Sequence, residues 1–260
     1  MHILISGSTK GIGNGLARRF LEKGHKVTIN GTTNKSVDKA LSDLKYINDE
    51  KNIQGFSANF INIDEVEALC KKSIINFGEI DIWINNAGVD QPRKKLWKIE
   101  TEELDKVIDI NIKGVFNGSK VAMNQMLKQK HGYIYNMEGF GRDNRKGDKI
   151  SLYGTSKKAV SYFTESLSLE AKDTCVKIGT LSPGMVATDF LKNSLPENKE
   201  EAKRIKNVYN ILADEVEPVT TYLVDQIIKN NDNGKKIKWL TTPKVMKRFM
   251  TAKFNKRDLF

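Results

Sequence analysis

The sequence is poor in the features that would indicate an oxidising, membrane or metal environment. Only two cysteines, Cys70 and Cys175, occur among 260 residues, so a disulfide framework is excluded and both are expected to be small buried side chains. No apolar run reaches the roughly 18 residues of a membrane span, and no leader-like segment precedes the first apolar run. His2, His25 and His131 lack metal-ligand spacing. We therefore expect a cytoplasmic protein without a metal site.

A basic stripe with interleaved aromatic residues is also missing. The formal charge is +11, which by itself would suit a nucleic acid or a lipid surface. The lysines are scattered, however, and the chain is rich in Lys, Asn and Ile together, as AT-rich codons favour. We therefore expect no nucleic-acid partner. The exception is the basic C-terminal tail, 243–260, whose apolar residues recur at roughly helical spacing. It would contact an anionic membrane peripherally, or pack on its own domain or a partner subunit.

Short apolar runs alternate with helical segments along the whole chain. Near-continuous apolar runs are typical of parallel strands covered on both faces. The alternation predicts an α/β fold, a Rossmann-type doubly wound sheet of seven parallel strands with helices on both faces, in a single domain, 1–260. A polar helical insertion, 189–215, is expected to lie over the ligand crevice as a substrate lid. The expected strands are 2–7, 26–31, 53–59, 80–88, 132–137, 176–184 and 236–242.

A glycine-rich turn follows the first expected strand. Its spacing, G-x-x-x-G-x-G, is a variant of the fingerprint that cradles the pyrophosphate of a dinucleotide. Glycine allows the tight turn and the close approach of backbone to phosphate, and the next helix offers free N–H groups at its N-terminus. The residues expected to bind the cofactor here are Gly7, Ser8, Thr9, Lys10, Gly11, Ile12 and Gly13.

The end of the second expected strand bears on the choice of nicotinamide cofactor. An acidic residue at this place binds the adenosine ribose of NAD, and it would repel a 2′-phosphate. Here the sequence reads INGTTN, with no acid. Lys10 can supply charge to the phosphate, although it would equally suit a solvated turn, and Thr32 and Thr33 can donate hydrogen bonds. The sequence favours NADP(H) over NAD(H).

Five motifs in order resemble the short-chain dehydrogenase/reductase family over nearly the whole chain. They are the glycine turn, NNAG at 85–88, the asparagine of DINIKG, a tyrosine and lysine four apart, and SPGMVAT at 182–188. The resemblance implies a small-molecule carbonyl substrate and a homodimer or homotetramer, although the closing Asp-Gly-Gly motif of the family is absent. By resemblance, the catalytic residues are Asn111, Tyr153 and Lys157, and further cofactor-binding residues are Asn59, Asn86, Ala87, Gly88, Pro183, Gly184, Val186 and Thr188.

The tyrosine–lysine pair has a clear chemical purpose. Tyrosine titrates near pH 10 when free, so it needs help to exchange protons at neutrality. Lys157 follows Tyr153 by one helical turn, and its ammonium is expected to lower the tyrosine pKa and to hold the nicotinamide ribose. Tyr153 would then donate a proton to the carbonyl oxygen as hydride arrives at carbon. By family likeness, Asn111 would bind a water that returns the proton through Lys157.

The serine that the family carries before this pair is missing. The segment reads NMEGFG, which resembles the chlorophyll b reductase branch of the family, with Gly139 at the serine position. A backbone N–H, a water or a protonated Glu138 would have to replace the serine as donor, although Glu138 could equally be a solvent-facing loop acid. The sequence predicts an NADP(H)-dependent reductase of a bulky aldehyde or ketone. The alternative is an NADP-binding sensor or scaffold that has lost catalysis.

Overall fold

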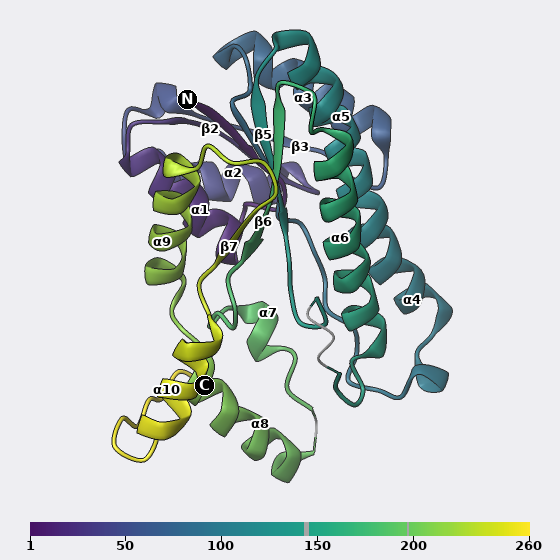
Figure 1. The fold of residues 1–260 in the computed structure, drawn as a ribbon, viewed down its shortest axis with the longest axis vertical. Helices are drawn as coiled ribbons and strands as arrows, with labels where there is room; N and C mark the ends of the chain where they lie inside the picture. The colour runs from purple at the N-terminus through teal and green to yellow at the C-terminus, as the bar shows by residue number, and fades with distance from the viewer. Residues whose placement is uncertain (143–145, 197) are drawn as a thin grey trace.

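A parallel sheet in the order β3-β2-β1-β4-β5-β6-β7 forms the centre of the molecule (Figure 1). The computed structural model describes residues 1–142, 146–196 and 198–260, and within them each neighbouring pair of strands runs parallel. The expected Rossmann-type sheet of seven strands is confirmed. The strands are β1 (His2–Ile5), β2 (Lys26–Gly31), β3 (Ile53–Ser57), β4 (Ile82–Asn85), β5 (Gly132–Met137), β6 (Val176–Ser182) and β7 (Lys235–Lys238).

Several expected strands extend too far. The expected strand over 80–88 pairs only over Ile82–Asn85, because the chain leaves the ladder there to hydrogen-bond the glycine turn. The last strand, β7, begins at Lys235, one residue earlier than expected, and ends at Lys238, four residues earlier than expected. Three lysines, Lys235, Lys236 and Lys238, occupy this edge strand, and charge on an edge strand opposes pairing with another sheet.

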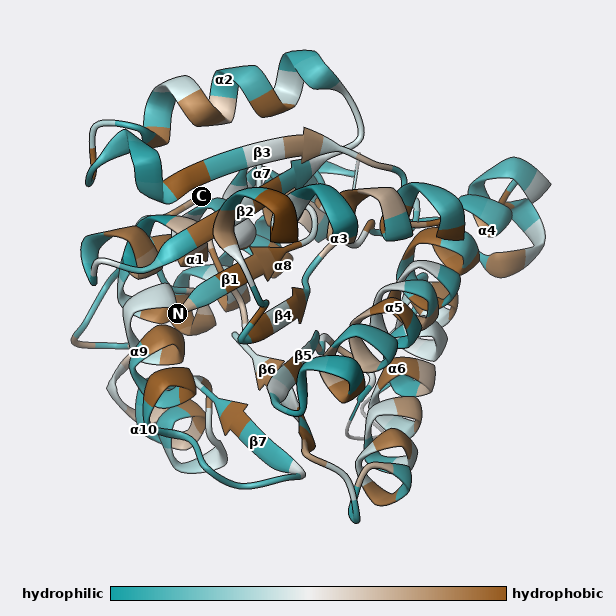
Figure 2. Cartoon of the chain, turned by 90° about the horizontal axis from the view of Figure 1, so that it is seen from above, coloured by the Kyte–Doolittle hydropathy of each residue, from teal (hydrophilic) through white to brown (hydrophobic). Residues whose placement is uncertain are grey.

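Helices cover both faces of the sheet and enclose one hydrophobic core on each (Figure 2). Side chains alternate along β1, so that Ile3 and Ile5 join the core under α1, α2 and α9, and Leu4 joins the core under α3, α5 and α6. The helices are α1 (Gly11–Glu22), α2 (Asn34–Leu44), α3 (Ile63–Phe77), α4 (Thr101–Ile108), α5 (Gly114–Gln129), α6 (Ser151–Glu170), α7 (Asp189–Lys192), α8 (Lys199–Leu212), α9 (Val216–Lys229) and α10 (Thr242–Thr251), with short 3-10 turns at Glu50–Asn52 and Leu96–Lys98.

The long helical segment that contains Asn111 is not a regular α-helix. A π-helical turn, Asp109–Lys113, separates α4 from α5 and carries Asn111. The sequence predicts Thr101 as the N-cap of this segment, but Thr101 is instead the first residue of α4. Glu100 is the extended N-cap residue, and its N–H donates to the Glu103 carboxylate at 3.3 Å. Single π turns of this kind occur frequently at functional sites.

The C-terminal tail is tied to the end of α8 by one buried carboxylate. Asp214 accepts hydrogen bonds from Trp239 Nε1 at 2.6 Å, from Arg248 Nη2 at 2.7 Å and from Arg257 Nη2 at 3.0 Å. Burial opposes the charged form of Asp214, but the bonds from Trp239 and Arg248 outweigh it and hold the pKa below its ordinary value. Packing on the domain, one of the two alternatives for the tail, is therefore observed. Of the cysteines, Cys70 is buried as expected, whereas Cys175 is exposed.

Candidate active site

The glycine turn makes room for the loop after β4. Gly7 and Gly11 both have φ of +59°, which only glycine adopts readily. A Cβ on Gly13 would lie 2.5 Å from Asn86 Nδ2, so the turn and the 85–88 loop are in contact through the glycine backbone. Asn86 Nδ2 donates to the carbonyl oxygen of Gly7 at 2.9 Å, and Ser6 Oγ accepts from Asn86 N and Ala87 N. Ser6 joins the two motifs, and the motif spacing gave no sign of it.

One cavity of about 920 Å³ joins this turn to the tyrosine–lysine pair. No acidic residue lies in the first turn of α1 or of α2, so the positive ends of both helix dipoles at the cavity are unopposed. The exposed Thr32 lies between β2 and α2. The sequence-predicted cofactor residues that line the cavity are Gly7, Thr9, Lys10, Gly11, Ile12, Gly13, Thr32, Asn86, Ala87, Gly88, Tyr153, Lys157, Pro183, Gly184, Val186 and Thr188.

Two of the predicted cofactor residues lie outside this cavity. Ser8 is fully buried, and its hydroxyl donates to the carbonyl oxygen of Ile5 and accepts from Asn30 N. Asn59 is exposed, and it holds the turn after β3 by accepting from Ile61 N. Asn30, which is buried, accepts from Gly7 N at 3.2 Å. Ser8 and Asn30 thus support the glycine turn from behind, whereas Asn59 supports only the turn after β3.

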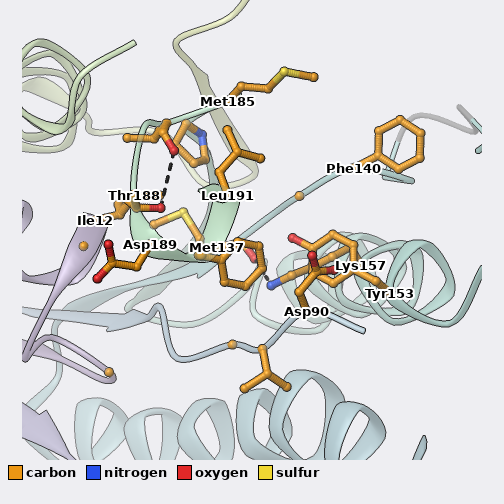
Figure 3. Close-up of a pocket in the computed structure, with 18 of the residues that line it drawn as sticks. Ile12, Asp90, Met137, Phe140, Tyr153, Lys157, Met185, Thr188, Asp189 and Leu191 are labelled. Carbon is orange, nitrogen blue, oxygen red and sulfur yellow. Dashed lines mark hydrogen bonds between the residues drawn. The ribbon is translucent and has the colours of Figure 1, made fainter. Parts of the chain in front are cut away.

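Tyr153 and Lys157 point into the cavity from one face of α6 (Figure 3). The Lys157 ammonium lies 5.9 Å from the centre of the Tyr153 ring and donates to the carbonyl oxygen of Met137 at 3.2 Å. Burial and the charge of Asp90 raise the pKa of Tyr153, and Arg93 opposes them. This direction is the reverse of the expected one, because burial outweighs any effect of the lysine. A raised pKa leaves Tyr153 protonated at neutral pH but makes it a weaker acid, so burial alone does not explain proton donation.

Burial also changes the titration of Lys157. It lowers the lysine pKa to about 8, and Glu138 only partly offsets it. The folded protein therefore binds fewer protons than the unfolded chain between pH 8 and the ordinary value of 10.5. We expect the free energy of unfolding of the wild type to rise with pH across this window, by up to about 3 kcal/mol, relative to Lys157→Met. Urea titrations of both proteins at several pH values from 8 to 10.5 measure it, and parallel pH profiles would contradict it.

Gly139 lies directly against the tyrosine hydroxyl. A Cβ built on Gly139 would lie 2.4 Å from Tyr153 Oη and 3.0 Å from Lys157 Cγ. No side chain fits there while Tyr153 keeps this position. No hydrogen bond among the described residues uses the Gly139 N–H, which leaves this backbone donor free at the wall of the cavity. The position of Tyr153 therefore requires glycine at position 139.

Glu138 turns away from the solvent. Only 3% of the residue is exposed, so it is not the solvent-facing loop acid that the sequence also allowed. Its carboxylate accepts from Ser161 Oγ at 3.1 Å and lies 3.5 Å from Arg142 Nη1. Ser161 is one helical turn beyond Lys157, so Glu138 extends the polar row along α6. Glu138 also lines the cavity, and its expected role as the donor that replaces the serine stays a prediction.

Asn111 is buried behind the catalytic pair and does not line the cavity. Its Nδ2 donates to the carbonyl oxygen of Val89 at 2.9 Å and to Ser156 Oγ at 3.0 Å, and its Oδ1 accepts from Val89 N at 2.8 Å. The side chain thus fixes the 85–88 loop to α6. Its expected role in holding a water stays a prediction.

Residues after β6 close the cavity over the tyrosine. Phe190 lies 5.9 Å from Tyr153 between ring centres. Two polar contacts join this segment to the rest of the site: Arg93 Nε donates to the carbonyl oxygen of Ser194 at 3.0 Å, and Lys149 pairs with Glu201 at 2.9 Å. The lining residues from α7, α8 and their connection are Asp189, Phe190, Leu191, Pro196, Glu201, Arg204, Ile205, Val208 and Tyr209.

A partly buried ion pair in the cavity wall was not predicted. Arg93 Nη2 lies 2.7 Å from Asp90 Oδ2, whereas the buried Arg93 Nη1 has no hydrogen-bond partner among the residues that the structure describes. Burial raises the pKa of Asp90, and Arg93 partly offsets this. Figure 3 shows Asp90 beside the catalytic pair, with Ile12, Thr188 and Asp189 across the cavity. The described residues contain no group of three His, Cys, Asp or Glu side chains able to hold a metal.

A family model described as short chain dehydrogenase matches residues 1–199. The chain belongs to the short-chain dehydrogenase family. This is a family of oxidoreductases that use nicotinamide cofactors, and members whose structures have been solved include complexes with NADH and with NADP+. The predicted family is confirmed.

Relatives of this short-chain dehydrogenase include the predicted branch. Chlorophyll(ide) b reductase NOL of Arabidopsis thaliana is 38% identical, with 87% of this chain and 65% of that protein covered. The probable chlorophyll(ide) b reductase NYC1 of rice is 30% identical over 96% of this chain and 52% of its own length. The chain thus spans about half to two thirds of these relatives. Levodione reductase, 23% identical, has the same fold with a TM-score of 0.83, covering 94% of this chain and 97% of its own.

No helix among the described residues is long and apolar enough to span a bilayer. The chloroplast location that the names of the plant relatives carry belongs to those proteins. The expected cytoplasmic location and the homodimer or homotetramer of this chain stay predictions.

Proposed function

We propose that this protein is an NADP(H)-dependent reductase that converts the carbonyl of a bulky substrate to an alcohol. The observation that carries the proposal is the buried Tyr153 hydroxyl, which lies against Gly139 in a cavity continuous with the glycine turn. Bound NADPH would supply a hydride to the carbonyl carbon. The carbonyl oxygen would take its proton from Tyr153, so that the products are an alcohol and NADP+.

The chain's own groups support this proton transfer. Tyr153 and Lys157 line the cavity together from one face of α6, and Lys157 would bind the nicotinamide ribose and return a proton to the tyrosine. The free N–H of Gly139 would donate to the carbonyl oxygen in place of the missing serine. Asn111 would hold the chain at Val89 against α6, behind Tyr153 and Lys157.

The shape of the cavity supports a bulky substrate. The cavity lining includes the apolar side chains of Phe140, Phe190, Leu191 and Val208. The segment 189–215 would act as the substrate lid. Arg93 Nη1 is a buried polar group of the cavity lining that makes no hydrogen bond among the described residues. Because Asp90 already neutralises this arginine, the free N–H would suit a neutral oxygen acceptor on the substrate, away from the reacting carbonyl.

The test is NADPH oxidation followed with large aromatic aldehydes and small aliphatic ketones. We expect turnover with the aromatic aldehydes and little with the ketones. Equal rates for both classes would contradict the proposed substrate. Tight NADPH binding without turnover across the whole panel would instead favour a sensor or scaffold.

Cofactor preference has its own test. A carboxylate at the end of β2 would repel a 2′-phosphate and bind ribose hydroxyls. Thr32 is the position to change, because it is exposed, whereas a Cβ on Gly31 would lie 2.7 Å from Thr9 Cγ2. We expect Thr32→Asp to weaken NADPH binding by at least about tenfold, a charge effect of about 1.4 kcal/mol or more, and to leave NADH binding equal or tighter. Fluorescence titration with both cofactors measures it, and Lys39→Gln is the control for surface charge. Unchanged NADPH affinity would contradict the NADP assignment.

A further inference from the structure

Helix α10 carries an exposed apolar surface. Met246, Phe249 and Met250 are 61%, 48% and 70% exposed, and Phe254, just beyond the helix, is 86% exposed. The three helical residues lie at positions i, i+3 and i+4, so they share one face. We call these four residues the α10 apolar surface. Side chains of this size seldom gather in water without a partner.

The basic residues of the tail fall into two groups. Arg248 and Arg257 bind Asp214, and Lys244 lies over the ring of Trp239, so these three hold the tail to the domain. The other three, Lys247, Lys253 and Lys256, are exposed. The only acidic residue in 243–260 is Asp258. The outward side of the tail therefore combines large apolar side chains with uncompensated positive charge.

The inward side keeps this surface in a fixed orientation. Arg248 Nη1 also donates to the carbonyl oxygen of Leu212, the last residue of α8, at 2.7 Å. Leu259 N donates to Asn210 Oδ1 at 2.9 Å, and the rings of Phe260 and Tyr209 are 5.3 Å apart between centres. Figure 1 shows α10 and α8 together at the end of the molecule where α7 lies. Val208 and Tyr209 of α8 line the active-site cavity.

We propose that the α10 apolar surface is a docking surface for an anionic lipid bilayer. The apolar side chains would enter the boundary between headgroups and acyl chains, and the three exposed lysines would meet the lipid phosphates. A neutral apolar partner would leave these lysines unmatched, and a second copy of the same surface would repel it. Docking would turn the cavity end of the molecule toward the membrane, which suits uptake of an apolar substrate if the proposed function holds.

The test is sedimentation of the full chain with vesicles of phosphatidylcholine alone and of phosphatidylcholine with phosphatidylglycerol in equal parts. We expect binding to the anionic vesicles that weakens with added salt. The variant Lys247→Gln/Lys253→Gln/Lys256→Gln should bind on the order of a hundredfold more weakly, since each lysine near an anionic surface contributes about 1 kcal/mol. The variant Phe249→Ser/Met250→Ser should lose at least about tenfold, because both apolar anchors are removed.

Matched controls remove the same kinds of residue elsewhere on the surface, so they test whether their location on the tail matters. Lys39→Gln/Lys71→Gln/Lys120→Gln removes the same charge elsewhere, and Ile75→Ser removes an apolar side chain that is 80% exposed on α3. Both controls should bind like the wild type. Absence of wild-type binding, or equal losses in variants and controls, overturns the proposal. So does a change of oligomeric state in the Phe249/Met250 variant without a change in vesicle binding. NADPH affinity reports folding in every variant, and it is independent of turnover.

Discussion

Replacing Tyr153 with phenylalanine is expected to lower kcat for carbonyl reduction by about two to four orders of magnitude, the usual contribution of a positioned proton donor. The hydroxyl is the group that burial keeps protonated in the cavity, whereas the ring contacts that shape the wall would remain in the variant. NADPH should therefore bind as tightly as to the wild type. Steady-state kinetics with the best aromatic aldehyde and a fluorescence titration with NADPH measure the two effects.

Tyr162→Phe is the matched control for this experiment. Tyr162 lies on the same helix, but it is 73% exposed and does not line the cavity. Its removal should leave kcat unchanged. A Tyr153→Phe protein with kcat near that of the wild type would show that protons reach the carbonyl by another route.

Restoring the family serine at position 139 is expected to damage the enzyme. The added Cβ would lie 2.4 Å from Tyr153 Oη, so the tyrosine must move or the loop must shift. A displacement of about 1 Å at a reacting group can cost roughly a hundredfold in rate. We expect Gly139→Ser and Gly139→Ala to lower kcat by about that factor alike, because the collision comes from the Cβ and not from the hydroxyl.

A neighbouring glycine serves as the control. A Cβ on Gly154 would meet only Gly141 Cα, at 4.0 Å, so Gly154→Ala should keep its activity. Faster turnover in Gly139→Ser than in Gly139→Ala would mean that the serine hydroxyl helps after all. In that case the tyrosine would have to adopt a different position from the one in this structure.

The fold and most of the cofactor cleft could be predicted because their signals are local. Strand alternation, the glycine turn and the spacing of Tyr153 and Lys157 are each contained in a short stretch of chain. Predicted strand ends were less accurate, as at 80–88, because the Asn86 and Ala87 N–H groups bond Ser6, about eighty residues away. A residue-by-residue pattern does not contain that contact.

The parts of the site that sequence reasoning missed depend on distances across the fold. Gly139 resembles a deleted serine in the sequence, and only the position of α6 shows that a Cβ there would meet the tyrosine. The expected fall in the Tyr153 pKa was reversed because burial is a property of the whole site. The Asp90–Arg93 pair lies in a loop without a motif, so its placement beside Tyr153 had no signal to reveal it.

The contacts of Asp214 with Trp239, Arg248 and Arg257 hold one end of the proposed lid in a fixed position. Two arginines and an indole hold the chain just beyond the C-terminal end of α8. Ser194 and Glu201, which lie inside the segment and farther from this anchor, contact Arg93 and the partly exposed Lys149. Residues of the lid that lie far from this fixed end would move more than residues beside it. Substrate would therefore enter near Ser194 and the N-terminal end of α8, and the Arg93–Ser194 and Lys149–Glu201 contacts would set how often this part of the lid opens.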